Sequence, residues 1–202
     1  NNGSITIEAW DQQQAQVTIS KTGNGVDTIG LPQVVWSGDE DKLFLRTLGG
    51  SDQTSLKYEI KVPRTLEKIV IRQSNGRIEV SGLDGKITAD LSNGSIHLND
   101  IKGGASAKTS NGSISATFDS VADDAPLDFL TSNGSIKLQF KGDLDADLSA
   151  QTNVGTIHFD GFDVPVEKVG LLGQQAHGKI GDGGRALSAR TTNGSISIEK
   201  VQ

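Results

Sequence analysis

The chain has 202 residues and contains no cysteine and no methionine. Without cysteine, neither a disulfide framework nor a thiolate metal site can form. No apolar run approaches the ~20 residues that a membrane-spanning helix needs, so no transmembrane segment is predicted. Methionine is missing at position 1 as well. We therefore expect a processed chain, and removal of a signal peptide would account for its missing start.

Positive charge and aromatic side chains are also scarce. Lysine and arginine number 19 against 25 acidic residues, which gives a net charge of −6. Nucleic acid binding through phosphates usually needs clustered basic residues, so this function class is not expected. The same charge disfavours adsorption to an anionic membrane surface. With only two tryptophans and one tyrosine, a groove that stacks sugars on aromatic rings is poorly supported.

Glycine, by contrast, is abundant, and much of it belongs to one recurring tetrapeptide. Asn-Gly-Ser-Ile begins at Asn2, Asn93, Asn111, Asn133 and Asn193. Near-copies begin at Asn75 and, with one inserted residue, at Asn153; from Asn75 the steps are 18, 18, 22, 20 and 40, the last being two twenties. A fixed period of about 20 residues is typical of stacked coils rather than of one irregular core.

Each coil divides into strands and turns. After each glycine the apolar residues alternate, as in Ile78 and Val80 or Ile96 and Leu98, which predicts strands with one buried face. We therefore predict an all-β fold, a β-solenoid in which coils of 18–22 residues stack like a single-stranded β-helix. The rival interpretation is a series of antiparallel hairpins, because Asn-Gly is also a strong hairpin signal. The constant spacing favours the solenoid.

If the coils stack in register, the turn asparagines line up at one corner. Their side-chain amides could then bond to one another from coil to coil. The predicted ladder contains Asn75, Asn93, Asn111, Asn133, Asn153 and Asn193.

The first 73 residues have a different pattern. We read them as an N-terminal β cap over the repeat solenoid of residues 74–202, within a single domain of residues 1–202. Inserts interrupt the later coils at 119–127 and 160–173, and loops on a regular scaffold are where binding sites commonly lie. The strands predicted in the cap and at its end are Gln16–Thr22, Lys42–Thr47, Ser55–Val62 and Lys68–Arg72.

Three acidic residues form the most conspicuous candidate site. Asp143, Asp145 and Asp147 alternate with apolar residues, which predicts three carboxylates on the outer face of one strand. Such a cluster is a candidate calcium site, because calcium takes six to eight oxygen ligands. An acid/base pair of a polysaccharide-processing enzyme and a solubilising acidic face are the alternatives.

The run from Tyr58 to Ile87 (YEIKVPRTLEKIVIRQSNGRIEVSGLDGKI) and the Ser-Asn-Gly-Ser-Ile copies that follow it carry a resemblance. The chain resembles a bacterial family of uncharacterised exported proteins that are described as candidate adhesins with β-strand repeats. The resemblance implies a β-solenoid of the cell envelope, either periplasmic or on the cell surface. It implies no catalytic residues.

From these observations we expect a non-enzymatic interaction module of the cell envelope, without a cofactor. It would bind a protein or glycan partner through its solenoid faces and inserted loops. Two alternatives come from other classes. One is a carbohydrate-active enzyme that uses surface carboxylates, and the other is a structural module that joins end to end through its final strand, Ser195–Glu199.

Overall fold

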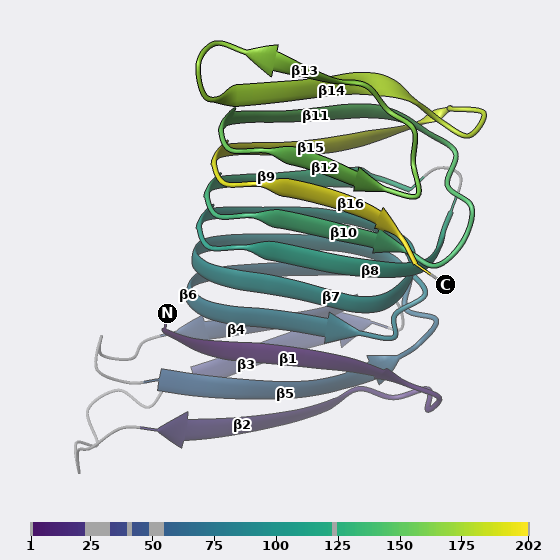
Figure 1. Ribbon diagram of the computed structural model, residues 1–202. Coiled ribbons are helices and arrows are strands. Elements are labelled where there is room, and N and C mark those ends of the chain that lie inside the picture. Colours follow the sequence, from purple (N-terminus) through teal and green to yellow (C-terminus); the bar gives the residue numbers. More distant parts are fainter. Residues whose placement is uncertain (1, 23–32, 40–41, 49–54, 123–124, 202) are drawn as a thin grey trace.

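A computed structural model describes residues 2–22, 33–39, 42–48, 55–122 and 125–201, and in these residues the regular elements are all strands (Figure 1). The strands of the N-terminal part are β1 (Asn2–Trp10), β2 (Gln16–Thr22), β3 (Gln33–Asp39), β4 (Lys42–Leu48) and β5 (Ser55–Pro63). The strands of the repeat region are β6 (Lys68–Ser81), β7 (Lys86–Asn111), β8 (Ile114–Val121), β9 (Leu127–Asn133), β10 (Ile136–Phe140), β11 (Ala146–Val154), β12 (Ile157–Asp160), β13 (Val166–Val169), β14 (Gly173–Ile180), β15 (Arg185–Asn193) and β16 (Ile196–Lys200).

The coils stack as parallel strands, which confirms the predicted solenoid and excludes the meander of hairpins. Strands β8, β10, β16 and β12 follow one another along one wall, and β9, β15 and β11 along the other (Figure 1). The register is that of the repeat, since Ile114 lies opposite Ile136, and Ile136 opposite Ile196. Fourteen strands, from both the N-terminal part and the repeat region, belong to this one sheet.

The core lies between the two walls and consists of the alternating residues that the sequence predicts to face inwards. Ile78, Val80, Ile96 and Leu98 are fully buried. Midway along the stack the layers are aromatic, with the ring of Phe118 stacked on that of Phe140 at 5.2 Å between centroids. This continuous column of apolar side chains stabilises the coils, none of which could bury its inner face alone.

The N-terminal end departs from the predicted cap. The first copy of the repeat, in β1, is itself a coil strand, parallel to β6 with Gly3 opposite Gly76. On its other side β1 pairs with β5, and β5 pairs in turn with β2, so the chain's first strand lies between two later ones. The predicted strands at Gln16–Thr22, 42–47 and 55–62 are present within one residue, whereas β6 continues well past residue 72.

The C-terminal coil also lies out of sequence order. Strand β15 lies between β9 and β11, and β16 lies between β10 and β12. The coils therefore do not all stack in the order of the chain, because the last copy of the repeat lies between two earlier coils. The prediction of end-to-end joining through Ser195–Glu199 is wrong, because this segment is paired on both sides and presents no open edge.

The insert at 160–173 is not only a loop, because it includes a short strand. It contains β13, which pairs antiparallel with β14, and β14 pairs antiparallel with β11. This hairpin covers the end of the stack, as Figure 1 shows above β11. The insert at 119–127 joins β8 to β9, and its residues 123–124 lie outside the described part of the chain.

Candidate interaction face

The Asn-Gly corner places the predicted asparagines in a ladder. Asn93 donates to Asn75 (2.9 Å), and Asn111 donates to Asn93 (2.8 Å). Beyond Asn111, Asn133 donates to Asn111 and Asn193 donates to Asn133, both at 2.8 Å. The amide hydrogen bonds thus follow the spatial order of the coils, in which residue 193 comes directly after residue 133.

Asn153 does not have the place that we predicted for it. Val154, and not Asn153, lies opposite Asn193. Counted back from the turn glycine, Thr152-Asn153-Val154-Gly155 matches Thr191-Thr192-Asn193-Gly194, so nothing is inserted and valine takes the ladder position. An apolar side chain cannot donate the next hydrogen bond to Asn193, and the coil that contains Val154 is the one covered by β14.

A second ladder, which the sequence reasoning missed, runs inside the same corner. The hydroxyls of Thr109, Thr131, Thr191 and Thr152 each donate to the carbonyl of the turn glycine in the neighbouring coil, at 2.8–3.1 Å. These threonines are the buried polar residues of the described part. Their signal in the sequence is a threonine three residues before the turn glycine in four of the coils, at Gly112, Gly134, Gly155 and Gly194, whereas Gly76 and Gly94 are preceded there by Gln73 and Leu91.

The turn glycines are required by the close approach of one coil to the next. Gly94 and Gly112 have φ of 133° and 148°. A Cβ on Gly112 would lie 1.9 Å from the carbonyl oxygen of Gly94, so no other residue fits at this spacing.

Polar side chains form ordered rows on the outer surface of β8, β10, β16 and β12 and of the residue directly before each of these strands, and we call this surface the network face. The first row is made of hydroxyls. The backbone N–H of Ser135 donates to Ser113 Oγ (3.2 Å) and that of Ser195 donates to Ser135 Oγ (3.3 Å). The hydroxyls of Ser195 and Thr156 lie 3.1 Å apart. This row therefore has a fixed geometry across four coils.

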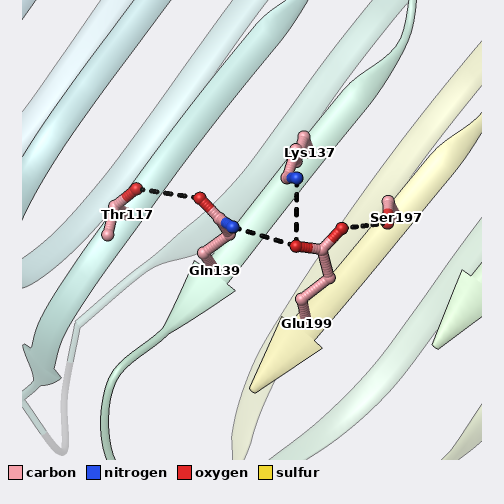
Figure 2. Close-up of polar contacts among 5 residues, drawn as sticks. All are labelled: Thr117, Lys137, Gln139, Ser197 and Glu199. Atoms are coloured by element: carbon pink, nitrogen blue, oxygen red, sulfur yellow. Dashed lines mark hydrogen bonds and ion pairs between the residues drawn. The ribbon is translucent and has the colours of Figure 1, made fainter. Parts of the chain in front are cut away.

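Glu199 is the centre of a polar network on this face (Figure 2). Its carboxylate accepts hydrogen bonds from Gln139 Nε2 (2.9 Å) and Ser197 Oγ (2.8 Å), and it forms an ion pair with Lys137 Nζ (3.0 Å). Thr117 Oγ1 donates in turn to Gln139 Oε1 (3.4 Å). Three neighbouring strands, β8, β10 and β16, thus hold five polar side chains in one arrangement.

The electrostatics of the network keep Glu199 ionised. Partial burial alone would raise its pKa, but the contacts from Lys137, Ser197 and Gln139 outweigh burial, so the pKa lies below the usual value. Further along the same wall, burial and the positive charge of Arg77 lower the pKa of His97, although Glu79 opposes this shift. The network face therefore holds an ionised carboxylate, paired with Lys137, at a fixed position.

The opposite corner of the coils is held by ion pairs. Lys141 contacts the carboxylates of Asp100 and Asp119, which raise the pKa of its ammonium group. Asp100 has a φ of 53°, and it lies where the register between β7 and β8 shifts. Lys200 pairs with Asp143 at 2.8 Å, and this contact lowers the pKa of Asp143.

The predicted calcium residues do not form one site. Asp143 and Asp145 precede β11, and only Asp147 lies within it, although Leu144, Ala146 and Leu148 do face the core as predicted. Asp143 binds Lys200, while Asp145 Oδ1 accepts the backbone N–H of Asp182 (2.8 Å). Within the described residues, no group of three acidic or histidine side chains converges on a point where a metal ion could lie.

The stacked parallel coils define the protein as an open β-solenoid. The chain belongs to the Toastrack DUF4097 family, which matches residues 64–199. The predicted fold and the resemblance to an uncharacterised adhesin-like family are thereby confirmed.

A solved structure of a candidate cell adhesion protein from Clostridium sporogenes is similar to this chain. The TM-score is 0.55, with 12% identity, over 98% of this chain and 88% of that chain. Such a low identity shows a shared fold and nothing more specific. No curated protein matches the chain. Among the residues described, no helix is long and apolar enough to cross a membrane.

Proposed function

We propose that this protein is a non-enzymatic module of the bacterial cell envelope that binds a protein or glycan partner through its network face. The observation that carries the proposal is the Glu199 network with its adjoining row of hydroxyls. The solved structure of similar fold supports it, because that protein is described as a candidate cell adhesion protein. An exported location, in the periplasm or on the cell surface, is part of the same proposal.

Preorganisation is the physical advantage of such a face. Side chains already held by cross-strand hydrogen bonds lose little freedom when a partner binds, so less of the interaction free energy is lost to ordering. An ammonium group has three donors, so Lys137 can bind Glu199 and a ligand oxygen at the same time. Hydroxyls, an amide and a carboxylate in fixed rows are suited to the hydroxyl groups of a glycan or to the polar rim of a protein.

The charges at hand support binding rather than hydrolysis. A glycosidase needs one carboxylic acid whose pKa is raised, so that it can donate a proton near neutral pH. Among the residues that the structure describes, the carboxyls with shifted pKa values are those of Asp143 and Glu199, and lysine partners contribute to lowering both pKa values. The oxygen Oδ1 of Asp145 is engaged by the backbone of Asp182.

The proposal is tested by screening the purified protein against a panel of bacterial envelope glycans and solubilised envelope proteins. Binding should raise the melting temperature, since saturation at ~100 times Kd adds ~2.7 kcal/mol to the free energy of unfolding. The double variant Lys137→Ala/Gln139→Ala should weaken the binding found by ~10-fold or more.

Lys108→Ala is the matched control. Lys108 also pairs with one carboxylate, that of Asp128, and its side chain is as exposed as that of Lys137 (47% against 48%), but it lies on the opposite wall. Equal loss in both variants, or a partner footprint that lies wholly away from the solenoid, would contradict the proposal.

A further inference from the structure

The C-terminal coil, residues 185–200, occupies a slot between two coils that precede it in the chain. On one side of the slot are β9 and β10, and on the other are β11 and β12. Both neighbours are parallel to the segment that separates them. The slot is therefore one coil high, about 9.6 Å between the flanking strands at ~4.8 Å for each coil.

The residues of this segment match the slot closely. Leu187, Ala189, Ile196 and Ile198 are buried in the core column. The Thr191 hydroxyl bonds to the carbonyl of Gly134. At Gly194, a Cβ would lie 2.1 Å from the oxygen of Gly134, so the slot accepts only a glycine there.

The segment is joined to the rest of the molecule by a single glycine-rich turn. Gly181, Gly183 and Gly184 all have positive φ, and the turn leads from the antiparallel strand β14 into the parallel strand β15. Because glycine tolerates many backbone conformations, such a turn can open into an extended linker at a small steric cost.

We propose that residues 185–200 are an exchangeable coil, which fills its own slot in the monomer and the slot of a second copy in a strand-swapped oligomer. A second copy of the chain is the partner that fits the slot. Its own residues 185–200 carry the required threonine, asparagine and glycine, in register with two pairs of apolar residues. Both forms make the same contacts outside the turn, so protein concentration during folding sets their ratio. A swapped dimer would present two network faces and bind repeated ligands with higher avidity.

The test uses the absence of native cysteine. Ser135 and Ser195 are exposed neighbours across the boundary of the slot, and the double variant Ser135→Cys/Ser195→Cys places two thiols there. Adjacent parallel strands lie ~4.8 Å apart, which is within the range that a disulfide spans. The protein is unfolded in denaturant, refolded at a series of concentrations, oxidised and separated without reductant.

We expect covalent dimers whose fraction rises at least severalfold with the concentration at refolding, alongside internally linked monomers. Protein kept folded throughout and oxidised at the same concentrations should give the internal link only. Internal links alone at every refolding concentration would overturn the proposal.

Ser113→Cys/Ser135→Cys is the control for chance collision. These two residues lie on consecutive coils within the body of the chain, and exchange of residues 185–200 does not separate them. This variant should form only the internal link. Dimers in equal amount from both variants would show non-specific association and would also overturn the proposal.

Discussion

At the Asn-Gly corner nearly every coil repeats the same residues and the same hydrogen bonds, whereas at the opposite corner each coil has its own connection. The first corner combines an asparagine ladder, a threonine ladder and glycines in contact with one another. The second has ion pairs of Lys141 and Lys200, a register shift near Asp100 and the insert before β9.

The two corners therefore have different structural roles. The uniform corner sets the height and register of every coil, so a coil fits wherever its neighbours present the same corner. The chain can therefore place β1, β15 and β16 beside strands that are distant from them in the sequence. The variable corner tolerates different lengths because ion pairs between exposed groups make weak demands on geometry. Substitutions at the two corners should accordingly differ in cost.

The largest effect is expected for Gly112→Ala. The new methyl group would overlap the carbonyl of Gly94, and the φ of 148° is unfavourable for alanine. We expect a loss of about 3 kcal/mol or more in the free energy of unfolding, measured by urea denaturation. At the opposite corner, Gly142→Ala meets its nearest atom, Asp119 O, at 3.8 Å and should be nearly neutral. Similar losses of unfolding free energy in Gly112→Ala and Gly142→Ala would refute the distinction between the corners.

A smaller loss is expected for Thr191→Val. This change keeps the shape but removes the hydroxyl that donates to Gly134 O at 2.9 Å inside the corner. We expect about 1–2 kcal/mol of destabilisation by thermal or urea unfolding. The adjacent Thr192 is exposed, so Thr192→Val is a matched control with little expected effect. An equal loss in the control would mean that the buried hydroxyl ladder contributes nothing specific.

Val154→Asn should extend the asparagine ladder by one coil. Val154 lies opposite Asn193 and is 43% exposed, so an amide there can donate to Asn193 without being buried. We expect a gain of about 0.5–1 kcal/mol in unfolding free energy. Asn153→Ala should be close to neutral, because Asn153 is outside the ladder register. No gain in unfolding free energy for Val154→Asn, together with a loss for Asn153→Ala, would show that Asn153 and not Val154 holds the ladder position.

The smallest effect is expected in the pH dependence of stability when Glu199 is replaced. Glu199 lies on the network face, between the two corners. Its pKa is lowered in the folded protein, so its contribution to stability is present above the unfolded pKa and is lost as pH falls through the folded pKa. Glu199→Gln should therefore lose less stability than the wild type between about pH 5 and pH 3. Asp163→Asn, on the exposed segment before β13, controls for the loss of one negative charge. An unchanged acid response in Glu199→Gln would contradict the network.

The period of the repeat was enough to predict the solenoid, the strands and the asparagine corner, because each coil carries its own turn and apolar alternation. It was not enough to predict spatial order. The 40-residue step to Asn193 has the length of two coils, but it contains the antiparallel β13–β14 hairpin. The turn glycine, and not the asparagine, is the fixed point of the repeat, so counting from Asn153 gives the wrong frame in this coil.

The candidate site was harder to predict for the same reason. Glu199 and Gln139 are 60 residues apart and meet only because β16 lies beside β10. The aspartates at 143–147 were conspicuous as a pattern, but their partners, Lys200 and the turn at Asp182, come from distant parts of the chain. A local motif therefore showed which side chains face outwards, and only the order of the coils showed which ones meet.

The order of the coils is the central claim, and disulfide formation in dilute, folded protein tests it most directly. Ser195 lies between Ser135 and Thr156, with hydrogen bonds to both. We predict rapid and complete internal linkage in Ser135→Cys/Ser195→Cys and none in Ser135→Cys/Thr156→Cys, whose thiols would be two coils apart. Rapid linkage of the second pair instead of the first would show that the coils stack in the order of the sequence, and would contradict this account.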